Sequence, residues 1–147
     1  MLVRLLYASR ARQPLGAEAL DAIFDTSLEQ NPRHGITGVL CHSDTTFLQA
    51  LEGDRDAVSR LFLNIGRDPR HHDVVLLNYE EIAERAFSDW SMGRVNTCKI
   101  NAATLLRFSA QGELDPYRMP GAASLALLRE LIAGASIVGR SAERGRH

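Results

Sequence analysis

The sequence lacks the features that mark secreted, membrane-spanning or nucleic-acid-binding proteins. Its 147 residues contain only two cysteines, Cys41 and Cys98, too few for a disulfide framework, and no secretory signal precedes them. No apolar run approaches the roughly 20 residues needed to cross a bilayer. The net charge of −1 gives no electrostatic reason to bind nucleic acid or an anionic membrane. We therefore expect a cytoplasmic protein with neither a nucleic acid nor a membrane as its partner.

Motifs that usually identify an enzyme are also missing. The chain has no glycine-rich phosphate loop, no zinc-binding cluster and no nucleophile elbow. His71 and His72 are adjacent, and adjacent residues rarely chelate one metal ion. Cys41 precedes His42, but consecutive strand residues point to opposite faces, so we interpret Cys41 as a small buried side chain. The sequence thus predicts neither an enzyme nor a metal site.

What the chain does contain suits one folded domain with a short appendage. Its length and its 45% hydrophobic content are enough for a sizeable core. Apolar periodicity, interrupted by glycine and proline, predicts the order strand, helix, strand, strand, helix, strand, strand. The expected strands lie at 2–8, 35–41, 47–53 and 74–79, with a short fifth strand reached through 87–93, and the helices lie between Gly16 and Asn31 and between Asp54 and Asp68.

Three details of these elements are specific enough to check. Pro32 disfavours helical geometry at the preceding residue, so the first helix should end at about Asn31. The segment Ser43–Thr45 is a plausible hairpin turn, and Asp54 should cap the second helix. The unbroken apolar start of the 74–79 strand indicates burial on both faces.

This order predicts an α+β, ferredoxin-like βαββαββ fold: a mixed five-stranded sheet with two helices on one face. We expect C-terminal helices, weak at 102–108 and strong at 124–138, to cover the other face. The predicted division is a domain at 1–97, a helical extension at 98–140 and a disordered basic tail at 141–147. The extension's apolar stripe either covers the sheet or contacts a partner; it comprises Leu127, Leu128, Leu131 and Ile132.

An amide interrupts the apolar face of the third strand. Alternation places Gln49 on the same face as Phe47 and Leu51, the face that should look into the core. A buried amide without hydrogen-bond partners costs about 1–3 kcal/mol, so Gln49 needs a polar neighbour or a polar ligand. Tyr7 in the first strand and Asn31 at the helix end are the candidates.

Each member of this trio also has an ordinary structural explanation. Asn31 fits a helix C-terminal cap, Gln49 fits a sheet amide bonded to a neighbour, and Tyr7 fits a core tyrosine whose hydroxyl finds a carbonyl. Together they offer donors and acceptors without charge, which suits the edge of a neutral, planar, polar ring. The loop after the second helix adds Arg67, Asp68, Arg70 and His71, which suit either a phosphate or a solvated charged surface.

These motifs, in this order, resemble the BLUF family of flavin-based blue-light sensors over roughly residues 1–97. The matching features are Tyr7 in the first strand, Asn31 before Gly35-Ile36-Thr37-Gly38, Gln49 in Phe-Leu-Gln-Ala-Leu-Glu-Gly, Arg67-Asp68 with Arg70-His71, and Arg85-Ala86-Phe87-Ser88-Asp89-Trp90-Ser91-Met92. The chain looks like a short, single-domain member without an attached enzyme. It departs from some relatives at Gln30, where they carry a histidine, which affects fine spectral tuning.

The resemblance implies an oxidised flavin, FAD or alternatively FMN, between the two helices. Helical spacing places Ile23 and Ile65 on the core stripes of their helices, where the resemblance implies that they would sandwich the ring. Asn31 would bond the ring's polar edge, and Gln49 would bridge Tyr7 to the ring. The ribityl and phosphate end would be bound by Arg67, Asp68, Arg70 and His71.

The resemblance also implies a light-driven electron and proton transfer through Tyr7 and Gln49, which rearranges hydrogen bonds. Trp90 and Met92 would then relay the signal through the fifth strand to the C-terminal helices. The output would be a contact with a downstream protein or with a second copy in a homodimer.

Two rivals remain from the sequence. The first is a flavin-free interaction module of the same fold, in which the polar trio is structural. The second is a small hydrolase of the acylphosphatase kind, for which Ser9-Arg10-Ala11-Arg12 supplies charge but not the glycines of a phosphate cradle.

Overall fold

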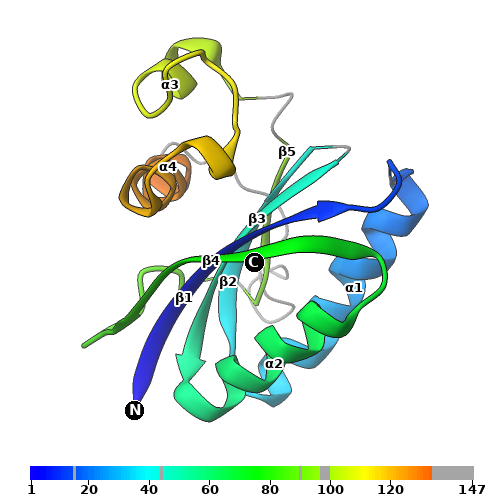
Figure 1. The fold of residues 1–147 in the computed structure, drawn as a ribbon. Helices are drawn as coiled ribbons and strands as arrows, with labels where there is room; N and C mark the ends of the chain where they lie inside the picture. The colour runs from blue at the N-terminus through cyan, green and yellow to red at the C-terminus, as the bar shows by residue number, and fades with distance from the viewer. Residues whose placement is uncertain (15, 44, 90, 97–99, 134–147) are drawn as a thin grey trace.

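The computed structural model describes residues 1–14, 16–43, 45–89, 91–96 and 100–133, and its elements follow the predicted order (Figure 1). The strands are β1 (Leu2–Ala11), β2 (Thr37–His42), β3 (Thr46–Asp54), β4 (His71–Glu81) and β5 (Gly93–Asn96). The long helices α1 (Ala17–Arg33) and α2 (Arg55–Arg67) alternate with them. After β5 come α3 (Ala102–Leu106), the 3-10 helix η2 (Pro116–Arg118) and α4 (Gly121–Ala133).

The five strands form one mixed sheet in the order β4-β1-β3-β2-β5. Neighbouring strands are antiparallel except for β2 and β5, which run parallel. The first four strands have the ferredoxin-like arrangement, and β5 extends it beyond β2. The predicted fold class is therefore confirmed. Strand β1 lies between β3 and β4, so its side chains reach the most protected part of the sheet.

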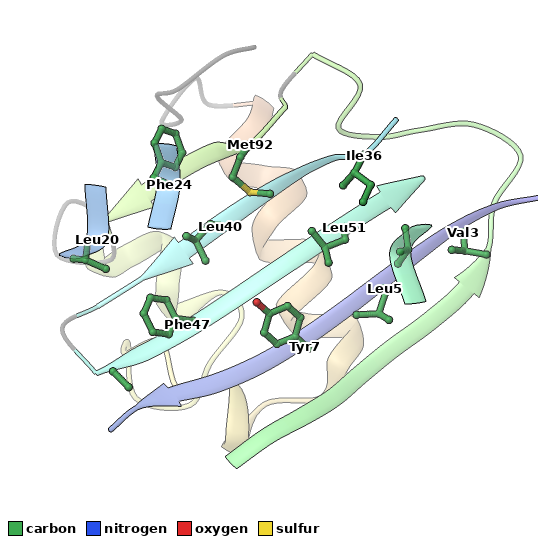
Figure 2. Close-up of a cluster of buried hydrophobic side chains, with 12 residues drawn as sticks. Val3, Leu5, Tyr7, Leu20, Phe24, Ile36, Leu40, Phe47, Leu51 and Met92 are labelled. Carbon is green, nitrogen blue, oxygen red and sulfur yellow. The ribbon is translucent and has the colours of Figure 1, made fainter. Parts of the chain in front are cut away.

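Each face of the sheet carries its own hydrophobic core. Helices α1 and α2 lie on one face, and the side chains of β1, β2 and β3 that point toward them form the first core (Figure 2). The second core joins the opposite face to α3 and α4, with Leu127, Leu128 and Leu131 at most 3% exposed (Figure 1). The prediction that the C-terminal helices cover this face is confirmed. The side chain of Ile132 lies outside the described residues, as does the predicted tail.

Local turn chemistry also agrees with the sequence in two places. The Ser43 hydroxyl accepts the Thr46 N–H at 3.1 Å and so closes the turn between β2 and β3. Asp54 caps α2, because its carboxylate accepts the Asp56 N–H at 3.3 Å.

The predicted end of the first helix was wrong by two residues. Helix α1 continues through Pro32 to Arg33. Pro32 has no N–H to donate, but residues after it complete the last turn. The Asn31 carbonyl accepts from the His34 N–H at 3.1 Å and from the Ile36 N–H at 2.9 Å. Gly35 follows with a φ of +66°, the left-handed conformation that ends many helices.

The predicted burial of the fourth strand was also wrong. Strand β4 is the edge of the sheet, and Val75 and Leu76, in the stretch predicted to be buried on both faces, are 40% and 51% exposed. Two irregularities in its pairing with β1 rotate side chains away from a regular alternation. Burial on both faces requires a packed layer on each face, and the exposure of Val75 and Leu76 shows that the layers cover β4 only in part at this edge of the sheet.

One glycine is required by a close approach between strands. A Cβ at Gly38 would stand 2.2 Å from the carbonyl oxygen of Ala50 in β3. We expect Gly38→Ala to lower the free energy of unfolding by about 3 kcal/mol or more, measured by urea denaturation. The matched control is Gly66→Ala in α2, where nothing lies within 4 Å; it should stabilise the protein by about 0.5–1 kcal/mol. Similar urea midpoints for the two variants would contradict this prediction.

Candidate functional site

Tyr7 and Gln49 meet at the middle of the sheet. They lie directly opposite each other in the β1–β3 ladder. The Tyr7 hydroxyl donates a hydrogen bond to Gln49 Oε1, and Gln49 Nε2 donates to the sulfur of Met92 at 3.3 Å. All three side chains are at most 5% exposed. The amide thus uses its acceptor end toward one residue and its donor end toward the other, as a buried amide must.

The surroundings of Tyr7 keep its hydroxyl protonated. Burial disfavours the phenolate and raises the pKa of Tyr7 well above its ordinary value, and the negative charge of Asp68 adds to this effect. The Tyr7 ring packs at a tilt against Phe62 of α2, with ring centroids 5.4 Å apart. At neutral pH, Tyr7 is therefore a fixed hydrogen-bond donor aimed at Gln49.

Asn31 connects α1 to the segment that precedes β5. Its side chain is 3% exposed, and Nδ2 donates to the carbonyl oxygen of Ser91 at 2.7 Å. The main chain closes the end of the helix, so the amide side chain does not act as the cap. Ser91 is the neighbour of Met92, and Asn31 and Gln49 therefore hold two consecutive residues.

A cleft runs between α1 and α2 above this floor. A cavity of about 200 Å³ has Ile23 and Ile65 on its two walls and Tyr7 and Gln49 among its lining. A neighbouring cavity of about 550 Å³ includes Asn31. Both cavities are lined by Thr26, Ser27, Leu61 and Asn64, so they are parts of one cleft. Its size is in the range of small-molecule sites, about 300–1,000 Å³.

Charged groups stand at the end of this cleft that follows α2. Asp68 and Arg70 form a two-bond ion pair, with Nε to Oδ1 at 3.0 Å and Nη2 to Oδ2 at 2.6 Å. The Arg70 guanidinium holds the pKa of Asp68 below its usual range. Arg67 instead points to Asn64, with Nη1 to Oδ1 at 3.1 Å, and it does not line either cavity. The structure thus brings Asp68 and Arg70 to the cleft, but not Arg67.

His71 belongs to the cleft as a neutral group. Its Nδ1 is 2.9 Å from the hydroxyl of the buried Ser9, and its ring packs against Phe47 with centroids 5.0 Å apart. Burial lowers the pKa of His71, so it carries no charge at neutral pH. It serves better as a hydrogen-bonding wall than as a cation for phosphate.

Several lining residues were missed from the sequence. Leu40, Phe47, Leu61 and Asn64 line the smaller cavity. Two of them carried a usable signal, because Phe47 shares the strand face of Gln49 and Leu61 precedes Ile65 by one helical turn. Ser9 carried none, since its role depends on a partner 62 positions away. The predicted relay residue Trp90 lies outside the described residues.

The residues of the cleft fit a flavin. Ile23, Leu61 and Ile65 give its walls apolar surface for a flat ring, and the floor of Tyr7 and Gln49 matches a ring edge with both donors and acceptors. Asp68 and Arg70 match a polar tail. Among the described residues, no group of three or more His, Cys, Asp or Glu could hold a metal ion. No helix in the described part of the chain is long and apolar enough to cross a membrane.

Fold and cleft together define a class: a ferredoxin-like domain suited to holding a flat cofactor between its two long helices. The family model BLUF, sensors of blue-light using FAD, matches residues 2–93, and the chain belongs to this family. It is therefore a flavin-binding blue-light sensor domain.

Relatives and solved structures agree with this assignment. The chain is 40% identical over 92 residues to the photoactivated adenylate cyclase subunit beta of Euglena gracilis, a match that covers 62% of this chain and 11% of that one. The chain thus spans about a tenth of the length of these curated relatives. It is similar to the dark-state structure of the BLUF protein BlrB (34% identity, TM-score 0.75, 91% and 96% of the two chains). It is also similar to BlsA in its photo-activated state (33% identity, TM-score 0.76, 90% and 95%).

Proposed function

We propose that this domain senses blue light through FAD bound between α1 and α2, and that Tyr7, Gln49 and Met92 form its switch. The observation that carries this proposal is the buried hydrogen-bond chain from the Tyr7 hydroxyl through the Gln49 amide to the Met92 sulfur, at the floor of the cleft. The amide group of Gln49 has an acceptor end and a donor end, so turning it around changes which neighbour it accepts from and which it donates to. A floor made of a phenol, an amide and a thioether suits a photochemical switch better than acid–base hydrolysis.

The chain's own residues would hold the cofactor from three sides. Ile23 and Ile65 would contact the two faces of the ring, because they stand on opposite walls of the cleft. Asn31 would bond the polar edge of the ring from the adjoining part of the cleft. Asp68, Arg70 and His71 would contact the ribityl and phosphate end. Arg67 would act from the exposed surface beside them.

When bound, the flavin supplies blue-light absorption and an electron-accepting ring. A phenol that gives up an electron becomes strongly acidic, so the Tyr7 proton would move along its hydrogen bond to Gln49 Oε1. The Gln49 amide would then rotate or tautomerise, which redirects its donor end away from Met92. The electron and a proton would return to Tyr7, so that no group is left oxidised or reduced and only the hydrogen bonds have changed. Two satisfied arrangements that differ by a few kcal/mol make such a switch reversible in the dark.

The signal would leave the cleft through Met92 and Trp90 toward β5 and the C-terminal helices. Strand β5 pairs with β2, and Val95 contributes to the second core, which includes α3 and α4. The protein would act as a cytoplasmic homodimer that regulates a downstream protein, and this domain would turn over no substrate itself. Residues 1–97 would form the sensor domain and residues 98–140 its extension.

The experiment is an absorption spectrum of the purified protein before and after blue light. We expect a yellow protein, release of FAD rather than FMN on denaturation, and a small red shift that reverses in the dark. Sedimentation velocity in both states tests the homodimer. A protein that stays colourless after reconstitution with either flavin would contradict the proposal and favour the flavin-free interaction module.

A further inference from the structure

A buried carboxylate on β3 holds the segment that joins β4 to β5. Glu52 is fully buried, and alternation along β3 places it on the same sheet face as Ala50, which belongs to the second core. Its Oε2 accepts from Arg4 Nε at 2.8 Å and from the Ala86 N–H at 3.0 Å. Its Oε1 accepts from the Phe87 N–H at 2.8 Å. One carboxylate thus fixes two consecutive main-chain groups of the connecting segment.

Arg85 also fastens this segment to the sheet, through Thr37 and the residue that precedes β2 by two positions. Its Nη1 donates to the hydroxyl of Thr37 at 2.9 Å, and its Nη2 donates to the carbonyl oxygen of Gly35 at 2.7 Å. Nη1 also reaches the carbonyl oxygen of Glu52 at 3.3 Å. Residues 85–87 are therefore tied to the start of β2 and the end of β3.

The switch contacts follow a short distance along the chain. Phe87 and Ser91 are four residues apart, a span of at most about 14 Å even when fully extended. Ser91 accepts from Asn31, and Met92 accepts from Gln49. The segment is thus anchored at 85–87 and meets the switch at 91–92. A fixed anchor so close by limits how far the Met92 sulfur can move.

We propose that Glu52, together with Arg85, is a positioning residue for the photochemical switch, setting the barrier that Met92 must cross between its two arrangements. This inference rests on the proposed function. Neither residue touches the cleft, and neither is assigned to the cofactor. Loosening the anchor should lower the barrier to rearrangement, so the lit state should relax faster in the dark.

The decisive variant is Glu52→Gln. The amide has one acceptor and one donor end, whereas the carboxylate accepts on both oxygens, so at least one main-chain N–H of the segment must face another donor. The matched control is Glu80→Gln. Glu80 accepts from the same Arg4, through Nη1 at 3.1 Å, but its side chain is 43% exposed. In the described part of the chain, its carboxylate makes no hydrogen bond to residues 85–87. The Glu80 amide keeps an acceptor for Arg4.

The measurement is the dark-recovery rate of the red shift, with the dark-state absorption maximum and the urea midpoint recorded for each variant. We expect Glu52→Gln to recover about tenfold faster, equivalent to about 1.4 kcal/mol in the barrier, and to move the dark-state maximum. Glu80→Gln should match the wild type in both. Arg85→Met, at a half-buried position outside the cores, should reproduce the faster recovery, and it decides the question if Glu52→Gln does not fold.

Wild-type recovery in Arg85→Met or in folded Glu52→Gln would overturn the inference, and so would equal acceleration in Glu80→Gln. A purely structural role would lower the urea midpoint without changing the recovery rate or the dark-state maximum. Failure of the proposed function looks different, because the wild-type protein would then show no red shift at all.

Discussion

Tyr7→Phe is expected to abolish the light-induced red shift while leaving flavin bound. The substitution removes the hydroxyl that donates to Gln49 Oε1 and with it the proton that the proposed switch moves. The aromatic ring stays, and so does its packing against Phe62, so the wall and floor of the cleft keep their shape. The lost hydrogen bond should cost about 0.5–1.5 kcal/mol of stability, which leaves the protein folded.

The measurement is a light-minus-dark difference spectrum of the flavin-loaded variant. Tyr79→Phe is the matched control, because Tyr79 lies on the edge strand β4 and is 40% exposed. It should show the full red shift. A Tyr7→Phe protein that still shifts and recovers like the wild type would sink the assignment of Tyr7 to the switch.

Gln49→Leu is expected to remove the red shift as completely, for a different reason. Leucine has a similar volume but neither accepts from Tyr7 nor donates to Met92. The buried Tyr7 hydroxyl then lacks its partner, at a cost of about 1–3 kcal/mol in unfolding free energy. The electron and proton donor is still present, so the variant isolates the part of the mechanism that requires an amide.

Two readouts check this prediction: the difference spectrum and the urea midpoint. Gln111→Leu, an exposed change of the same type in the C-terminal extension, should leave both unaltered. A reversible red shift of wild-type size in Gln49→Leu would show that rotation or tautomerisation of this amide is not the stored change. Loss of flavin from the variant would instead assign Gln49 a binding role.

The sequence determined much of this protein because its apolar pattern has clear periods. Alternation in the 47–53 strand placed Gln49 on the face of Phe47 and Leu51, and all three are buried there. Helical spacing put Ile23 and Ile65 on the inner stripes of their helices, and both line the cleft. Such predictions succeed because a side chain's direction depends on its own backbone, which is a local property.

Other features depended on tertiary contacts that the sequence pattern does not reveal. The fourth strand looked buried from its composition, yet its exposure follows from its place at the sheet edge. Arg67 looked equivalent to Arg70, but only Arg70 turns toward the cleft. The predicted end of α1 failed because main-chain bonds from residues beyond Pro32 complete its last turn.

The sequence by itself determined the order of strands and helices, the amide in an apolar strand, and the family. Only the tertiary structure decided which groups satisfy the buried polar atoms: Ser91 for Asn31, Ser9 for His71, and two N–H groups of the β4–β5 segment for Glu52. The physical reason is distance along the chain. These partners lie 60, 62 and about 35 positions apart along the chain. Hydrogen bonds between them can form only after the strands have paired and brought them together.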